Sequence, residues 1–229
     1  MESPAADIAV LLSGGLDSAV LAADAARSAV VQPVYVRAGL AWEDEEMALL
    51  AGLLASPPFL RRLRPLATIA VDAADLYPAS HWARRGDPPA YDTPDEDVYL
   101  PGRNILLLSK AGVFCALHGI HRLAIGPLAG NPFPDATPAF FESMARALTL
   151  GLAHQVAIEA PLTSMHKEDV IRLGARLGVR FELTLSCMNP SGGRHCGLCS
   201  KCRERRDAFD AAGIEDPTEY LAAAPRTIP

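Results

Sequence analysis

Short apolar runs alternate with longer helix-forming segments over most of the chain. Five runs predict β-strands: 8–12, 30–36, 68–71, 122–125 and 156–158. Six longer segments predict helices: 17–28, 43–55, 105–118, 138–152, 167–177 and 199–212. Strands that alternate with helices in this way predict an α/β fold, with a largely parallel sheet covered by helices on both faces.

Two places depart from this regular alternation. Pro33 lies within the second strand and lacks an N–H donor, which predicts an irregular start or an edge position for that strand. Residues 77–98 are rich in proline, aspartate and aromatic residues and show no period. A loop of this length is either functional or mobile, or else a tolerated insertion.

Composition narrows the class of protein. The chain has 229 residues, 50% of them hydrophobic and 21% charged, which suits one α/β domain with a small appendage. No apolar run approaches the roughly 20 residues that span a bilayer, and residues 1–4 lack the basic segment of a signal peptide. We therefore expect a cytoplasmic protein. The formal net charge of −6 argues against broad nucleic-acid binding.

The sequence Ser13-Gly14-Gly15-Leu16-Asp17-Ser18 joins the first strand to the first helix. Its glycines allow a tight turn and let an anion approach the backbone, and the helix N-terminus adds a positive partial charge. Ser13 and Ser18 add hydroxyl donors. The pattern predicts a phosphate-binding loop distinct from a Walker A loop, which ends in Gly-Lys-Ser/Thr. An ordinary Ser/Gly turn is the alternative.

Further candidate groups follow later strands. Because ligands of parallel sheets bind beyond the carboxyl ends of the strands, four features are expected to converge there: Ser13, Arg103, Gly126 and the segment before Lys167. Arg103 offers a planar fork for phosphate or carboxylate, and Asn104 offers a donor and an acceptor unless it is a helix N-cap. Lys167 opposes the dipole of its helix, so it either faces an anion or is offset by Glu168 and Asp169.

Four of the five cysteines form one late cluster: Cys187, Cys196, Cys199 and Cys202. The spacing C-x8-C-x2-C-x2-C predicts a closed tetrahedral site that plays a structural role. Zinc is favoured, and an iron–sulfur cluster has the same ligand count. The fifth cysteine, Cys115, lies in an apolar helix and is expected to fill the core.

The remaining polar residues give weaker signals. Five basic residues surround the cysteines: Arg194, Lys201, Arg203, Arg205 and Arg206. With Glu204 and Asp207 among them they are expected to form a solvated helix face, and RNA contact is the alternative. Five histidines show no partner spacing and are expected at the surface or as caps: His81, His118, His121, His154 and His195.

The residues from Ser13 to Ser18 match the SGGxDS motif of the PP-loop ATP pyrophosphatases, and the whole chain resembles the 7-cyano-7-deazaguanine synthase family within them. Several further segments match that family in order: Pro101-Gly102-Arg103-Asn104, Leu108-Ser109, Pro161-Leu162 with Lys167, Ser186-Cys187, Cys196-Gly197, Cys199, Cys202-Arg203, Ala208-Phe209 and Asp216-Pro217. The resemblance implies a Rossmann-like (adenine nucleotide alpha hydrolase-like) sheet at 1–185 and a small zinc-binding helical segment at 186–229.

The resemblance also implies an activity. Family members convert 7-carboxy-7-deazaguanine and ammonia to 7-cyano-7-deazaguanine with ATP, on the route to queuosine, and are zinc-containing homodimers. Catalytic roles would fall to Asp17, Arg103 and Lys167, with Mg²⁺ expected beside ATP. ATP would be bound by Leu12, Ser13, Gly14, Gly15, Leu16, Asp17, Ser18, Ala19, Arg103, Asn104 and Lys167. Zinc would be bound by the four clustered cysteines.

Two segments depart from the family pattern. Residues 126–135 replace a longer family segment, and Thr137 stands where the family has arginine. Residues 36–42 replace an Asp-Tyr-Gly-Gln-Arg-His type stretch. The alternative is therefore a paralogue that adenylates another carboxylate, an amide or an RNA base. A non-catalytic nucleotide sensor is a third reading, against which the intact loop and Lys167 argue.

Overall fold

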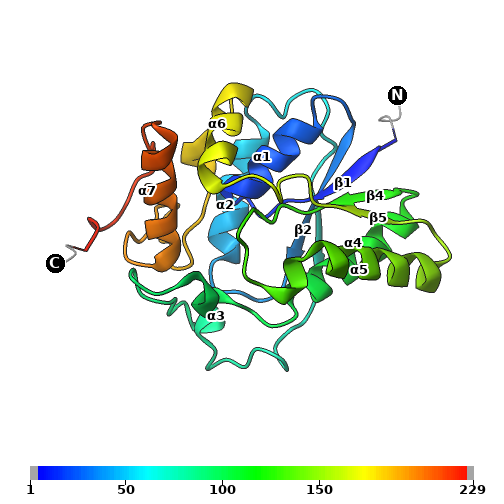
Figure 1. Ribbon diagram of the computed structural model, residues 1–229, viewed down its shortest axis with the longest axis horizontal. Helices are drawn as coiled ribbons and strands as arrows, with labels where there is room; N and C mark the ends of the chain where they lie inside the picture. Colours follow the sequence, from blue (N-terminus) through cyan, green and yellow to red (C-terminus); the bar gives the residue numbers. More distant parts are fainter. Residues whose placement is uncertain (1–4, 226–229) are drawn as a thin grey trace.

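The computed structural model describes residues 5–225 and shows a parallel sheet between two layers of helices (Figure 1). The strands are β1 (Ile8–Leu11), β2 (Val31–Arg37), β3 (Ala67–Ala70), β4 (Arg122–Ala124) and β5 (Ala157–Glu159). The helices are α1 (Leu16–Ala25), α2 (Glu43–Leu54), α3 (Trp82–Arg85), α4 (Arg103–Leu117), α5 (Pro138–Leu152), α6 (Lys167–Leu177) and α7 (Ser200–Ala212). All the predicted strands and helices are present, so the predicted fold class is confirmed.

The strands lie in the order β3-β2-β1-β4-β5, and every neighbouring pair is parallel. The strands after β1 are added first on one side of it (β2, β3) and then on the other (β4, β5), so the order reverses between β1 and β4. Doubly wound sheets bind their ligands at the carboxyl ends of the strands at such a switch point. β2 lies inside the sheet, with Val10 of β1 opposite Pro33. The predicted edge position for β2 is wrong. Because β2 pairs on both sides, only the missing N–H of Pro33 is lost from the ladder.

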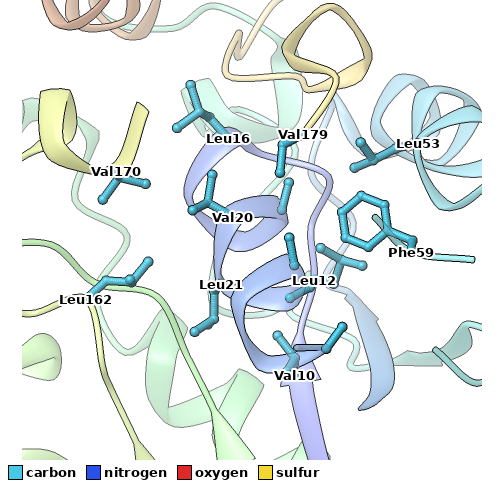
Figure 2. Close-up of a cluster of buried hydrophobic side chains, with 14 of the residues drawn as sticks. Val10, Leu12, Leu16, Val20, Leu21, Leu53, Phe59, Leu162, Val170 and Val179 are labelled. Carbon is cyan, nitrogen blue, oxygen red and sulfur yellow. The ribbon is translucent and has the colours of Figure 1, made fainter. Parts of the chain in front are cut away.

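Alternate residues of β1 serve two separate cores. Val10, and Leu12 just after the strand, face α1, α2 and α6 in a core that also contains Phe59 (Figure 2). Phe209 belongs to the same core. Leu11 faces α4 and α5. A strand buried on both faces has to be apolar throughout, which is why this run carries no polar residue before Ser13. Cys115 of α4 is completely buried in this second core, as expected for a core cysteine.

The aperiodic segment 77–98 is ordered by a third apolar cluster. It contains the short helix α3 and a 3₁₀ turn at Asp95–Val98. Tyr77 and Val98 from this segment pack with Trp42 and with the buried cysteines of the C-terminal cluster. The segment therefore links the carboxyl ends of the strands to the cysteine region and covers the expected ligand-binding edge.

Two sequence predictions concerned a signal peptide and a membrane-spanning segment. Residues 1–4, on which the expected absence of a signal peptide depends, lie outside the described part of the chain. Within 5–225, no helix combines the length and apolar character that crossing a membrane requires.

Candidate active site and metal centre

The glycine loop between β1 and α1 is closed by its own serines. Ser13 Oγ accepts the Gly15 N–H at 3.1 Å, and Ser18 Oγ donates to the Gly15 carbonyl at 3.0 Å. Gly14 has φ = +84°, a left-handed conformation that strongly favours glycine. This arrangement leaves the N-terminus of α1 uncapped by any side chain. An uncapped helix N-terminus behind a glycine turn is open to an anion, so the loop stays a candidate phosphate-binding turn.

Lys167 at the start of α6 reaches into this loop. Its Nζ lies 2.7 Å from Asp17 Oδ2 and 2.9 Å from Glu204 Oε1. Burial alone would lower the pKa of Lys167, but the charges of Asp17 and Glu204 outweigh that effect and raise it. The neighbouring carboxylate of Asp169 instead accepts from the His166 N–H and closes a capping box. Lys167 therefore faces the loop and is not offset by its neighbours in sequence.

Arg103 and Asn104 begin α4, as predicted, but Asn104 is not its N-cap. That position is taken by Gly102, and the Asp135 carboxylate caps the helix by accepting the Asn104 N–H at 3.0 Å. The Asn104 amide donates to the Asp135 carbonyl at 2.9 Å. Asn104 thus fixes residues 134–136 against α4. Arg103 is left to line the cavity beside the glycine loop.

Two adjoining cavities open beside the glycine loop, with volumes of about 270 and 500 Å³. Ser13, Asp17 and Arg103 line both of them. Lys167 and Glu204 line only the larger one. As expected, one cavity is lined by the glycine loop, Arg103, Gly126 and Lys167.

Three residues that line these cavities each have a buried polar atom without a hydrogen-bond partner among the described residues. The atoms are Asp17 Oδ1, Asp95 Oδ1 and Arg103 Nε. Such orphans are rare in folded proteins and mark places where a ligand completes the network. A cationic fork, a free carboxylate oxygen and a glycine turn together fit a phosphorylated ligand with its metal ion.

Glu46 of α2 lines both cavities and was not anticipated from the sequence. Its Oε2 accepts the Tyr35 hydroxyl at 2.6 Å, beneath the glycine loop. Burial raises the pKa of Glu46 to about 7, against the opposing effects of Tyr35 and Arg103. The only signal in the sequence was its position at the start of an acidic helix.

Glu46 predicts a pH-dependent stability. The pKa of Glu46 is raised from 4.5 to about 7 on folding. The stabilisation linked to its protonated form is therefore fully present below about pH 4.5, and the free energy of unfolding falls as the pH rises through 7. The loss is on the order of 3 kcal/mol. Relative to the natural chain, Glu46→Gln should therefore gain stability between pH 5 and 8 in denaturant unfolding. Glu142→Gln, on the exposed face of α5, is the matched control. Parallel curves for Glu46→Gln and the natural chain would contradict this assignment.

The four clustered cysteines come together at the other end of the site. All four Sγ atoms lie within 4.8 Å of one another, so the cluster could hold a metal ion. Separations of 3.9, 4.0 and 3.5 Å join Cys196 to Cys202, Cys187 to Cys199 and Cys199 to Cys202. A tetrahedral site with Zn–S bonds of about 2.3 Å places its sulfurs about 3.8 Å apart. These three separations are close to that value, so the donor set fits a zinc ion.

Backbone groups around the cluster favour thiolates. Cys187 Sγ accepts the N–H groups of Asn189 and Cys196 at 3.3 and 3.2 Å. Gly197 donates its N–H to Cys202 Sγ at 3.4 Å and has φ = +82°. A Cβ atom at Gly197 would lie 2.2 Å from the Ala222 carbonyl oxygen, so only glycine fits this knuckle.

The expected solvated face of the basic C-terminal helix is wrong for two of its residues. Arg205 is completely buried and donates to Thr184 Oγ1, the Phe181 carbonyl and Thr218 Oγ1. Glu204 pairs with Lys167 and does not lie on a solvated face. Burying the guanidinium is possible because oxygen acceptors surround it. The periodicity of the helix gave no sign of these distant acceptors.

His195 also differs from its expected surface position. It is buried, and its Nε2 accepts the Ser186 N–H at 3.0 Å. Burial, with a smaller effect of Arg205, lowers the pKa of His195 to about 3, so the ring is neutral. The predicted capping role holds for His81, whose Nδ1 accepts the Ala83 N–H.

Comparison with known proteins places the chain in a family. The model described as "Queuosine biosynthesis protein QueC" matches residues 69–213. A relative from Methanopyrus kandleri, named 7-cyano-7-deazaguanine synthase, is 35% identical over 241 residues, which cover 93% of this chain and 97% of the relative. The chain belongs to the QueC family. A relative of the same name from Caldicellulosiruptor bescii is 33% identical, over 92% of this chain and 96% of its own.

The range matched by the QueC family model includes most of the candidate site residues. The matched range contains Arg103, Lys167 and the four cysteines, whereas the glycine loop precedes it. Among solved structures, a predicted subunit of a tRNA methyltransferase from Methanocaldococcus jannaschii aligns with a TM-score of 0.49 and 14% identity, over 95% of this chain and 92% of that one. That likeness is too weak to bear on function.

The segments that depart from the family pattern both reach the site of this QueC chain. Trp42, at the end of 36–42, and Phe133, from 126–135, line the larger cavity. Thr137 is the N-cap of α5, and its Oγ1 accepts the Phe140 N–H at 3.2 Å. Both segments therefore contribute to the cavity wall, close to the glycine loop and to the cysteine region.

Proposed function

We propose that this chain is an ATP-dependent, AMP-forming ligase that converts 7-carboxy-7-deazaguanine and ammonia to 7-cyano-7-deazaguanine. The observation that carries the proposal is its 35% identity to a 7-cyano-7-deazaguanine synthase over nearly the full length of both chains. The placement of the glycine loop, Arg103 and Lys167 around one cavity supports it.

The reaction requires activation of a poor electrophile. Attack of the substrate carboxylate on the α-phosphate of ATP forms an acyl-adenylate and releases pyrophosphate. Ammonia then displaces AMP and leaves an amide. A second ATP then adenylates the amide oxygen and releases pyrophosphate, and departure of AMP with loss of the two N–H protons forms the nitrile. Every step builds or moves negative charge on phosphate, so the protein has to orient substrates and neutralise that charge rather than supply a nucleophile.

The proposed roles follow from where the residues lie. Ser13 to Ser18 would hold the departing phosphates with backbone N–H groups, and Lys167 and Arg103 would neutralise them. ATP-bound Mg²⁺ would be held by the free Asp17 Oδ1 and would stabilise the charge on the phosphates. Asn104 would contribute to the site indirectly, by holding Asp135 in place. Its backbone N–H and its side-chain amide both donate to that residue.

We place the acceptor in the part of the larger cavity that is remote from the glycine loop. Trp82 from segment 77–98 lines it and stacks on Trp42, with ring centroids 6.0 Å apart. An aromatic wall suits a flat bicyclic substrate. Asp95, also at this wall, has a buried Oδ1 that lies 3.8 Å from the Arg203 guanidinium and has no hydrogen-bond partner among the described residues. A carboxylate oxygen there suits the N–H groups of a guanine-like edge.

The C-terminal segment has a structural role in this proposal. The four cysteines would hold zinc as a closed site, which contributes folding free energy and leaves no position for substrate. The functional division is then an ATP-binding part at 1–185 and a zinc-holding part at 186–229. Reduced cysteines suit the cytoplasm, and we expect a homodimer there, as in the family.

Phosphorus-31 NMR tests the proposed class of reaction. With ATP, Mg²⁺, ammonium and 7-carboxy-7-deazaguanine, we expect AMP and pyrophosphate to accumulate and to depend on the carboxylate. Omitting ammonium should stop turnover after the first activation. ADP and inorganic phosphate as products would contradict an adenylating mechanism, whatever the acceptor.

A further inference from the structure

We propose that Glu204 is a positioning residue, which holds the Lys167 ammonium at the glycine loop and is itself held there by the four-cysteine cluster. The proposal rests on the proposed function for the role of Lys167 in phosphate binding. Its own content, a mechanical link between the metal centre and the nucleotide site, rests on contacts that need no ligand.

The first part of the link is a network of four charged groups. Glu204 Oε1 lies 2.9 Å from Lys167 Nζ, and its Oε2 pairs with Lys201 Nζ. Lys167 also pairs with Asp17, so two carboxylates and two ammonium groups balance one another. All four line the larger cavity. The side chains of Lys167 and Glu204 are 17% and 22% exposed, so the pair is largely shielded from solvent screening.

The second part is the attachment of Glu204 to the cluster. Cys199 is the N-cap of α7 and Cys202 lies in its first turn, so Glu204 follows the last cysteine by two residues. The next residue, Arg205, is anchored by hydrogen bonds to Thr184 and Ser186. These contacts fix the rotation of α7 about its axis. Glu204 therefore faces the cavity because the cysteines and Arg205 leave α7 no other orientation.

A third contact joins the same region to the glycine loop directly. The Leu185 N–H, two residues before Cys187, donates to the Gly14 carbonyl at 2.9 Å. On the other side of the cluster, Glu45 of α2 accepts the N–H groups of Gly192 and Gly193. The cysteine region therefore contacts the glycine loop through the Leu185 backbone and contacts Lys167 through Glu204.

These contacts predict how turnover and binding separate in Glu204→Gln. The change removes one negative charge and leaves Lys201 without its partner, so the site becomes more positive and ATP should bind as tightly as before or more tightly. Lys167 loses one of its two orienting carboxylates. We expect kcat for AMP release to fall about tenfold or more, with no rise in the Kd for ATP. Asp210→Asn, an equal charge change at an exposed position of α7, should alter neither.

A second readout needs neither ATP nor acceptor. The reactivity of Lys167 toward trinitrobenzenesulfonate, mapped by peptide mass, should rise several-fold in holoprotein carrying Glu204→Gln, because a carboxylate partner keeps the amine protonated. Chelating the metal should raise Lys167 reactivity in the natural chain but add little in Glu204→Gln. Lys201→Met removes the cation that competes with Lys167 for Glu204, so Lys167 should become less reactive. This opposite change tests the link even if Glu204→Gln does not fold.

The outcomes separate the two proposals. No AMP from the natural chain with an elevated Lys167 reactivity in Glu204→Gln would refute the ligase and keep the link. Equal Lys167 reactivity in Glu204→Gln, Asp210→Asn and the natural chain would overturn the link. So would a chelated natural chain in which Lys167 stays slow to react, because the cluster would then not position Glu204.

Discussion

Lys167→Met should lower AMP release by about a hundredfold to a thousandfold, the usual cost of removing one charged or hydrogen-bonding group from a developing negative charge. The Lys167 ammonium is held beside the glycine loop by Asp17 and Glu204. Methionine keeps the length and packing of the side chain but cannot neutralise phosphate. Steady-state release of AMP, measured with saturating ATP and acceptor, checks this expectation.

The control for this variant has to separate catalysis from stability. Lys167→Met leaves two partly buried carboxylates without their shared cation, which should also lower the free energy of unfolding. Lys110→Met removes a lysine from an exposed position of α4 and should leave AMP release unchanged. Full turnover by folded Lys167→Met would remove this lysine from the mechanism.

Cys199→Ser should destabilise the protein by about 4 kcal/mol or more, because losing a structural metal ligand belongs to the most damaging class of substitutions. For a chain of this size that corresponds to a fall in Tm of roughly 10 °C. Cys199 Sγ lies 3.5 Å from Cys202 Sγ and 4.0 Å from Cys187 Sγ, so the whole site depends on it. Thermal unfolding with a parallel zinc assay measures both effects.

Cys115→Ser is the matched control, since it makes the same change in a buried cysteine remote from the cluster. It buries a hydroxyl in an apolar core and should cost only about 1–3 kcal/mol, with zinc content unchanged. Chelation of the natural chain should reproduce the loss seen in Cys199→Ser. A natural chain that keeps its Tm after chelation would show that the cluster holds no structural metal.

The sequence predicted the sheet and its helices because their signals are local. Each strand is a short apolar run and each helix has its own period, so no distant contact is needed to recognise either. The glycine loop and the cysteine knuckle were also local motifs. Position in the sheet was not local: Pro33 indicated an edge, yet β2 pairs with both neighbours.

The residues that the sequence missed are defined by partners far along the chain. Glu204 pairs with Lys167, and Arg205 donates to Thr184 and to the Phe181 carbonyl. Within its own helix, each looked like an alternating surface charge. Burial of a charge depends on acceptors contributed by other elements, and a helical period carries no information about them.

Identity of the acceptor is the central claim. The decisive measurement is the mass of the product formed from 7-carboxy-7-deazaguanine, ATP, Mg²⁺ and ¹⁵N-labelled ammonium by the metal-loaded protein. We predict a single product in which the carboxyl group has become a nitrile carrying the label. Labelled amide alone would show that the second activation does not occur. Unchanged carboxylate would contradict the account, and the altered segments 36–42 and 126–135 at the cavity would then select a different acceptor.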